Sequence, residues 1–114
     1  MLDLNMEFQR GILFIRLRGI LDSTTSMKLQ NALNIAIHQI GIKYLLLNCE
    51  KLYEIDKDSI DMIFKRVREL LNLEGKFLVC GFNDYVRLKI ENSELNSIIC
   101  KTENEQKAVQ LIKI

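Results

Sequence analysis

The sequence predicts a single α/β domain: a mixed, mainly parallel β-sheet with an N-terminal hairpin and about four helices packed on it. After residue 25, short apolar runs typical of strands alternate with segments of helical periodicity, and this order implies crossover connections between parallel strands. No proline interrupts any of these segments. The 114 residues are enough for one hydrophobic core and too few for two, so we expect one domain over residues 1–114.

The N-terminal segment predicts a β-hairpin. Residues 2–9 alternate apolar and polar side chains, which is the period of a half-buried strand. Arg10-Gly11 is suited to a tight turn, and residues 12–18 form the second strand, with Arg16 and Arg18 facing water. The core-facing side chains of this second strand are those of Leu13, Ile15 and Leu17.

The next three elements are a helix, a buried strand and a second helix. Residues 25–39 have an apolar helical face, with several possible N-caps in Ser23-Thr24-Thr25-Ser26 and a terminating Gly41. Residues 44–49 are an almost unbroken apolar run, which is typical of a central strand covered on both faces. A helix follows from Asp56 to about Leu73. The apolar face of the first helix consists of Leu29, Leu33, Ala36, Ile37 and Ile40.

The C-terminal third contains shorter elements. We expect a strand over residues 77–82, a short helix over 85–91 that is capped by Asn83, and a short strand over 98–100. The segment Thr102-Glu103-Asn104-Glu105 has the pattern of a capping box and predicts a last helix. Its apolar face would consist of Ala108, Val109, Leu111 and Ile112.

Composition excludes several classes of function. The formal charge is +1 with acids and bases scattered, so the chain lacks the basic stripe of a nucleic-acid-binding protein. No apolar run is long enough to span a bilayer, and the first nine residues do not form a signal peptide. We therefore expect a cytoplasmic protein that neither binds nucleic acid nor inserts into a membrane.

The reactive side chains do not predict an enzyme. Cys49, Cys80 and Cys100 lack Cys-x-x-Cys spacing and lie in or beside apolar runs, so we interpret them as buried free thiols. His38, the one histidine, is expected on a helix surface. No nucleophile is paired with a base. The two glycine-rich nucleotide-binding motifs, Gly-x-x-x-x-Gly-Lys and Gly-x-Gly-x-x-Gly, are both absent from the sequence. We therefore expect no catalytic residue and no cofactor.

The corner between the buried strand and the second helix is the candidate functional site. In α/β sheets, ligands and partners bind at such strand-to-helix corners. Asp56 is a good N-cap, and Asp58 and Asp61 lie where carboxylates complement the helix dipole, so all three could serve stability alone. They also offer oxygen ligands for Mg²⁺ or Ca²⁺, but Lys57 places a cation among them, and we expect no metal site.

Four segments in order resemble the STAS domain, the fold of bacterial anti-sigma factor antagonists. Gly19-Ile20-Leu21-Asp22 is similar to the Gly-x-Leu-Asp that ends the second strand of that family. Residues 45–48, then Leu52 and then Ile55-Asp56, resemble the strand that leads to the family's phosphorylation loop. Residues 74–80 are similar to the helix-to-strand turn beyond it. The resemblance covers nearly the whole chain, without gaps from the second strand into the short third helix.

The resemblance implies a non-enzymatic switch. Such proteins bind an anti-sigma factor that is also a serine kinase, and phosphorylation of a Ser or Thr in an Asp-Ser-Ser-Gly-like loop ends the interaction. Here the loop is Asp56-Lys57-Asp58-Ser59, so Asp58 takes the position of the phosphorylatable serine and Ser59 that of the glycine. Either Asp58 is a permanent partial mimic of phosphoserine, which we favour, or Ser59 accepts the phosphate instead.

We therefore predict a cytoplasmic interaction switch whose partner is an anti-sigma factor or a related Ser/Thr kinase-type protein. Asp58 would set the charge of its binding surface, Asp56 would hold the helix start and Lys57 would contact the partner. The alternative is a STAS accessory subunit of an ABC-type transporter or of a larger signalling assembly. The predicted partner-binding residues are Asp22, Ser23, Asp56, Lys57, Asp58 and Asp61.

Overall fold

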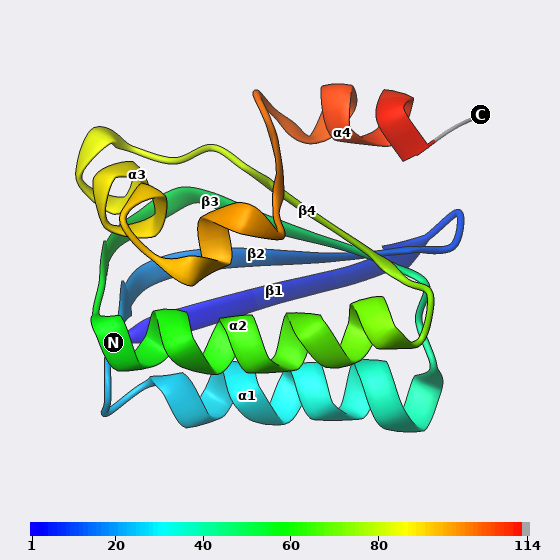
Figure 1. Ribbon diagram of the computed structural model, residues 1–114, viewed down its shortest axis with the longest axis horizontal. Coiled ribbons are helices and arrows are strands. Elements are labelled where there is room, and N and C mark those ends of the chain that lie inside the picture. The colour runs from blue at the N-terminus through cyan, green and yellow to red at the C-terminus, as the bar shows by residue number, and fades with distance from the viewer. Residues whose placement is uncertain (113–114) are drawn as a thin grey trace.

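A five-stranded mixed sheet in the order β1-β2-β3-β4-β5 organises the fold (Figure 1). The computed structural model describes residues 1–112. β1 pairs antiparallel with β2, and all other neighbours are parallel, as predicted. β3 is the central strand, as its apolar run indicated. The strands are β1 (Leu2–Gln9), β2 (Ile12–Leu21), β3 (Tyr44–Ile55), β4 (Lys76–Cys80) and β5 (Cys100–Thr102).

The predicted hairpin between β1 and β2 is present. Arg10 and Gly11 both have positive φ, at 56° and 79°, which are the left-handed conformations of a two-residue type I′ turn. The expectation that β1 is half-buried is only partly correct. Leu2 is buried and Leu4 is partly buried, but Met6 is exposed, as is Phe8.

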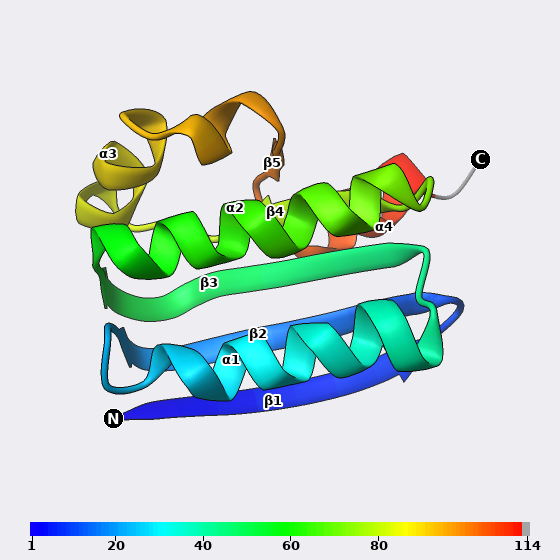
Figure 2. The same ribbon diagram turned by 60° about the horizontal axis from the view of Figure 1, so that its bottom comes forward.

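Helices cover both faces of the sheet (Figures 1 and 2). α1 (Ser26–Asn34) and α2 (Lys57–Asn72) lie side by side on one face, and α3 (Asp84–Glu91) with the 3₁₀ turn η2 (Glu94–Ser97) completes the larger core there. α4 (Glu105–Ile112) packs on the opposite face over a smaller apolar cluster. Among the described helices, none is both long and apolar enough to cross a membrane.

The first helix differs from prediction at both ends. α1 continues as a π-helical segment, η1 (Ile35–Ile40), which ends at the predicted Gly41 with φ 75°. This change of helical period turns the Ile40 side chain toward solvent. The prediction that Ile40 belongs to the buried face of the helix was therefore wrong. Thr25 precedes the helix without capping it, because its hydroxyl donates to the Ile20 carbonyl oxygen at 2.9 Å.

The C-terminal elements also differ from prediction. β5 lies two residues later than expected. η2 was not predicted, because residues 94–97 show no clear local pattern. The capping box does not form, because Thr102 belongs to β5 and α4 is capped by Asn104, whose Oδ1 accepts the Lys107 amide at 2.9 Å. Glu105 instead makes a two-bond contact with Arg16 of β2, at 2.7 and 2.9 Å, so Arg16 is half-buried under α4 and does not simply face water.

The cysteines are partly as expected. Cys49 and Cys80 are buried free thiols, but Cys100 is exposed on the short edge strand β5. Burial raises the pKa of Cys80 to about 11 and raises that of Cys49 further, so both stay protonated at neutral pH.

Candidate functional site

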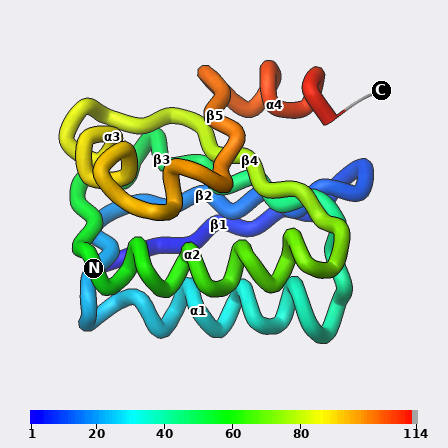
Figure 3. The backbone as a smooth tube through the Cα atoms, viewed as in Figure 1, coloured from blue at the N-terminus to red at the C-terminus, as the bar shows by residue number. Residues whose placement is uncertain are grey.

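The candidate site lies where the C-terminal ends of β2 and β3 meet the start of α2 (Figure 3). Leu21 of β2 lies opposite Ile55 of β3 in the sheet. The amide of Asp56 donates to the Leu21 carbonyl oxygen at 3.1 Å, so the chain leaves both strands at the same edge. This register brings Asp22 and Asp56, thirty-four residues apart in the chain, to one corner.

Asp56 caps α2, as its position predicted. Its backbone is extended, with φ −98° and ψ 169°, and its Oδ1 accepts the Ser59 amide at 2.8 Å. That hydrogen bond satisfies one of the amides that a helix N-terminus leaves unpaired. The carboxylate is therefore committed to holding the helix start.

Lys57, Asp58 and Asp61 project from the first turns of α2 with exposed side chains. Asp58 and Asp61 are three residues apart, so they share one face of the helix. Both carboxylates lie near the positive end of the helix dipole. The tip of α2 therefore presents two acids and one lysine to solvent.

Ser59 points the opposite way from its neighbour Asp58. Its side chain is fully buried, and its hydroxyl has no hydrogen-bond partner among residues 1–112. A kinase could reach that hydroxyl only if the first turn of α2 opened. The first turn of α2 thus presents an exposed carboxylate at Asp58 and a buried hydroxyl at Ser59.

The predicted residues of the neighbouring strand end form a tight turn. Asp22 Oδ1 accepts from the Thr24 amide at 2.9 Å and from the Thr24 hydroxyl at 2.7 Å. These bonds, with the Thr24 hydroxyl first, lower the pKa of Asp22, so it stays ionised. Ser23 is exposed at the tip of this turn. Asp22 is therefore occupied within its own turn, whereas the Ser23 side chain faces solvent.

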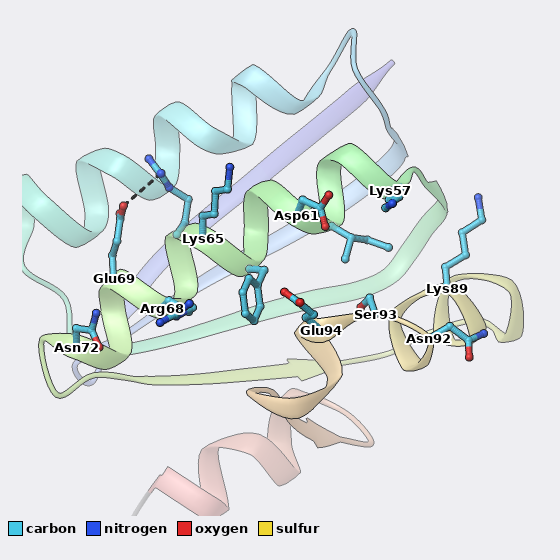
Figure 4. A pocket seen from close by; sticks show the side chains of 13 residues that line it. Lys57, Asp61, Lys65, Arg68, Glu69, Asn72, Lys89, Asn92, Ser93 and Glu94 are labelled. Atoms are coloured by element: carbon cyan, nitrogen blue, oxygen red, sulfur yellow. Dashed lines mark ion pairs between the residues drawn. The ribbon is translucent and has the colours of Figure 1, made fainter.

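A groove of about 1080 Å³ opens beside the corner, between α2 and the α3–η2 segment (Figure 4). Ile60 and Phe64 contribute apolar side chains to its lining. Lys57 and Asp61 belong both to the predicted corner and to this groove. Five cations and three acids line it: Lys57, Lys65, Arg66, Arg68, Lys89, Asp61, Glu69 and Glu94. The surface next to the acidic helix tip is therefore positively charged on balance.

α3 and η2 also contribute to the site, although no sequence pattern indicated it. Lys89 Nζ donates to the Ile55 carbonyl oxygen at 3.0 Å and lies 4.6 Å from the centre of the Tyr85 ring. Asn83 caps α3, as predicted, and also donates to the Leu52 carbonyl oxygen at 3.1 Å. These contacts hold α3 against the end of β3. No local pattern near Lys89 indicates that it lies beside Ile55, thirty-four positions earlier in the chain.

The corner can present charge, but it does not assemble a metal centre. Within residues 1–112, no three His, Cys, Asp or Glu side chains are close enough together to hold a metal ion. Asp56 is turned back toward its own helix amide, whereas Asp58 and Asp61 face solvent.

Comparisons with known proteins agree with this fold. The model of the STAS domain family matches residues 3–108. An anti-sigma F factor antagonist of Paenibacillus polymyxa is 27% identical over 113 residues, covering 99% of this chain and 97% of that protein.

Two solved structures have the same fold. The unphosphorylated anti-sigma factor antagonist SpoIIAA superposes with a TM-score of 0.84 at 23% identity, covering 97% of this chain and 96% of that one. A putative anti-sigma factor antagonist from Thermotoga maritima superposes with a TM-score of 0.90 at 13% identity, covering 97% and 95%. At these identities the structural likeness establishes the fold.

Proposed function

The chain belongs to the STAS domain family, and from this premise we propose that it is an antagonist-type switch that binds an anti-sigma factor of the serine-kinase type. The binding surface consists of Lys57, Asp58 and Asp61 at the tip of α2, with Ser23 on the adjoining turn. Asp56 and Asp22 support this surface through their hydrogen bonds to the Ser59 amide and to Thr24, respectively. The protein acts by occupying its partner and carries out no chemistry itself.

The opposite orientation of Asp58 and Ser59 is the observation that carries the proposal. Asp58 is exposed, whereas the Ser59 hydroxyl is buried. A carboxylate supplies about −1 charge where a phosphoserine would supply about −1.5 to −2. Asp58 is thus a fixed charge smaller than that of the phosphate whose addition ends binding in the family, so the partner still binds. The first turn of α2 offers the partner's kinase activity no accessible hydroxyl.

The groove beside the corner supports a protein partner. Lys57 and Asp61 connect the helix tip to a surface that combines apolar side chains with charges of both signs. Protein interfaces commonly pair a desolvated apolar centre with a polar rim. The α2 tip and this groove together form a continuous surface of that composition.

A binding measurement tests the proposed surface. We expect the full chain to bind the kinase-type anti-sigma factor of its own organism in isothermal titration calorimetry, and Asp61→Lys to weaken that binding at least about tenfold, equivalent to about 1.4 kcal/mol. Glu103→Lys is the matched control, because it makes the same charge change on an exposed residue just before α4. Equal affinities of the two variants would place the interface elsewhere.

A phosphorylation measurement tests the role of Asp58. The wild-type chain incubated with the kinase and ATP should gain no phosphate on α2 in peptide mapping, because Asp58 cannot accept the phosphate stably and Ser59 is buried. Asp58→Ser should gain one phosphate. A phosphate mapped to Ser59 in the wild-type chain would show that the first turn of α2 opens, and the fixed-charge proposal would be abandoned.

A pull-down from the native cell distinguishes the alternative use of the fold. Recovery of a kinase-type anti-sigma factor supports the proposal. Recovery of an ABC-type ATPase, with no anti-sigma factor, would instead favour the accessory-subunit role.

A further inference from the structure

The outer strand of the sheet, β1, exposes an apolar surface that the proposed function does not use. β1 is the edge strand beside α1 (Figure 2). Met6 is 53% exposed and Phe8 is 58% exposed, although both lie on the same face of the sheet as the buried Leu2. Exposed apolar side chains on a long edge strand are a feature that monomeric proteins usually avoid, because such an edge invites another strand.

The backbone of β1 is also open along this edge. The Ile20 amide donates to the Met1 carbonyl oxygen, so the odd-numbered residues of β1 are those that bond to β2. The even-numbered residues therefore point their amides and carbonyls outward. Lys28 Nζ donates a hydrogen bond to the first of these outward carbonyls, that of Leu2, at 2.9 Å. Within the described chain, the outward groups of Leu4, Met6 and Phe8 have no strand beside them.

We propose that a second copy of this chain pairs antiparallel with β1, about a two-fold axis that places Met6 opposite Met6 of the second copy. The outward backbone groups of Leu4, Met6 and Phe8 then exchange about six hydrogen bonds between the copies. A two-fold interface uses the same patch on both chains, so the patch must complement itself. The sequence of β1 meets that condition in this register.

Cross-strand pairs on both faces are compatible in this register. On the helix face, Leu4 lies opposite Phe8 of the second copy, so apolar side chains meet apolar ones. On the other face, Asn5 lies opposite Glu7 and Asp3 opposite Gln9, so each acid meets an amide that can donate a hydrogen bond. The Arg16 guanidinium also contacts Glu7 at 2.9 Å within each copy and partly balances the negative charge of the Glu7 carboxylate.

Neighbouring registers fail on charge or on apolar coverage. Centring the pair on Asn5 places Asp3 opposite Glu7, and centring it on Glu7 places the two Glu7 side chains together. Like charges directly opposite each other destabilise a strand pair. Centring it on Leu4 leaves Phe8 beyond the paired segment. The Met6 register is therefore selected by the side chains as well as by the backbone.

The dimer leaves the proposed binding surface free. The two-fold axis at Met6 lies beside Ile15, in the middle of β2, whereas the α2 tip lies beside the end of β2, on the side of β3. An interface this small is expected to be transient, with a dissociation constant on the order of 10–100 μM.

Sedimentation velocity of the full chain over a concentration series tests the pairing. We expect the wild-type chain to move from monomer to dimer across that range. Met6→Lys and Met6→Glu should each weaken self-association at least about tenfold, because each sets two like charges opposite one another. An equimolar mixture of these two variants should recover the dimer, because a lysine then faces a glutamate.

Met27→Lys is the matched control, because Met27 is a similarly exposed methionine, at 59%, on α1. It should leave the dimer unchanged, and circular dichroism should show all variants folded. A wild-type chain that stays monomeric at about 1 mM, far above the expected constant, overturns the proposal. A dimer insensitive to both Met6 variants, or a mixture that does not recover association, overturns it as well.

Discussion

Replacing Asp56 with alanine should destabilise the protein through the start of α2. The variant loses the hydrogen bond from the Ser59 amide to Oδ1, which is 2.8 Å long. Loss of an N-cap typically costs about 1 kcal/mol, and loss of a carboxylate at a helix N-terminus adds about 0.5 kcal/mol. We therefore expect the free energy of unfolding to fall by about 1.5 kcal/mol.

That loss is large enough to measure by thermal unfolding. An entropy of unfolding of about 2.1 cal/mol/K per residue gives about 0.24 kcal/mol/K for 114 residues. The melting temperature of Asp56→Ala should therefore fall by about 6 °C in calorimetry or in circular dichroism at 222 nm. The change should appear without any partner present.

Two further variants separate the cap from the charge. Asp56→Asn keeps an oxygen that can accept the Ser59 amide and loses only the charge, so its melting temperature should fall by about 2 °C. Asp58→Ala removes a first-turn charge from an exposed side chain and should behave similarly. If Asp56→Ala and Asp56→Asn melt together, the hydrogen bond is not what holds the helix start, and this reasoning is refuted.

Three other substitutions test the surrounding structure. Gly19→Ala should lower the free energy of unfolding by about 2 kcal/mol or more in urea titration, because Gly19 has φ 116° and a Cβ there would lie 2.2 Å from the Met1 carbonyl oxygen; an unchanged midpoint would contradict this. Ser59→Ala should stabilise by about 0.5–1 kcal/mol, because it removes a buried hydroxyl without a partner; destabilisation would indicate a hidden hydrogen bond. The Arg16 hydrogen bond lowers the pKa of Glu105 below its ordinary 4.5. The stability that this hydrogen bond contributes is therefore complete above about pH 4.5 and is lost as the pH falls through the lower pKa of the folded state. The melting temperatures of wild type and Glu105→Gln should therefore converge in acid, and a constant difference from pH 7 to pH 2 would show that the hydrogen bond does not perturb Glu105.

Local patterns in the sequence were sufficient for most of the fold. The apolar run of β3, the Arg10-Gly11 turn and the cap at Asp56 each depend on a few neighbouring residues, and all three are present in the structure. The cap predicted at Thr102 failed for the opposite reason. Glu105 is drawn to Arg16, eighty-nine residues away, and a local pattern contains no information about so distant a partner.

The candidate site likewise combines residues that local sequence patterns identify with residues that only the fold brings together. Its acids were identifiable because N-cap and first-turn positions are local properties of α2. The groove was not, because Lys89 and Glu94 reach it only after β4 and α3 have returned the chain to the corner. The inward orientation of Ser59 and outward orientation of Asp58 also emerged only once α2 was placed on the sheet.

The sequence by itself determined the order of strands and helices, the helix start at Asp56 and the carboxylate at position 58, because these depend on residue type and short spacing. Tertiary structure alone decided that Ser59 is buried, that α4 is tied to Arg16 and that Met6 stays exposed at the edge of the sheet. Burial and long-range pairing depend on which elements pack together, and that is settled only when the whole chain has folded.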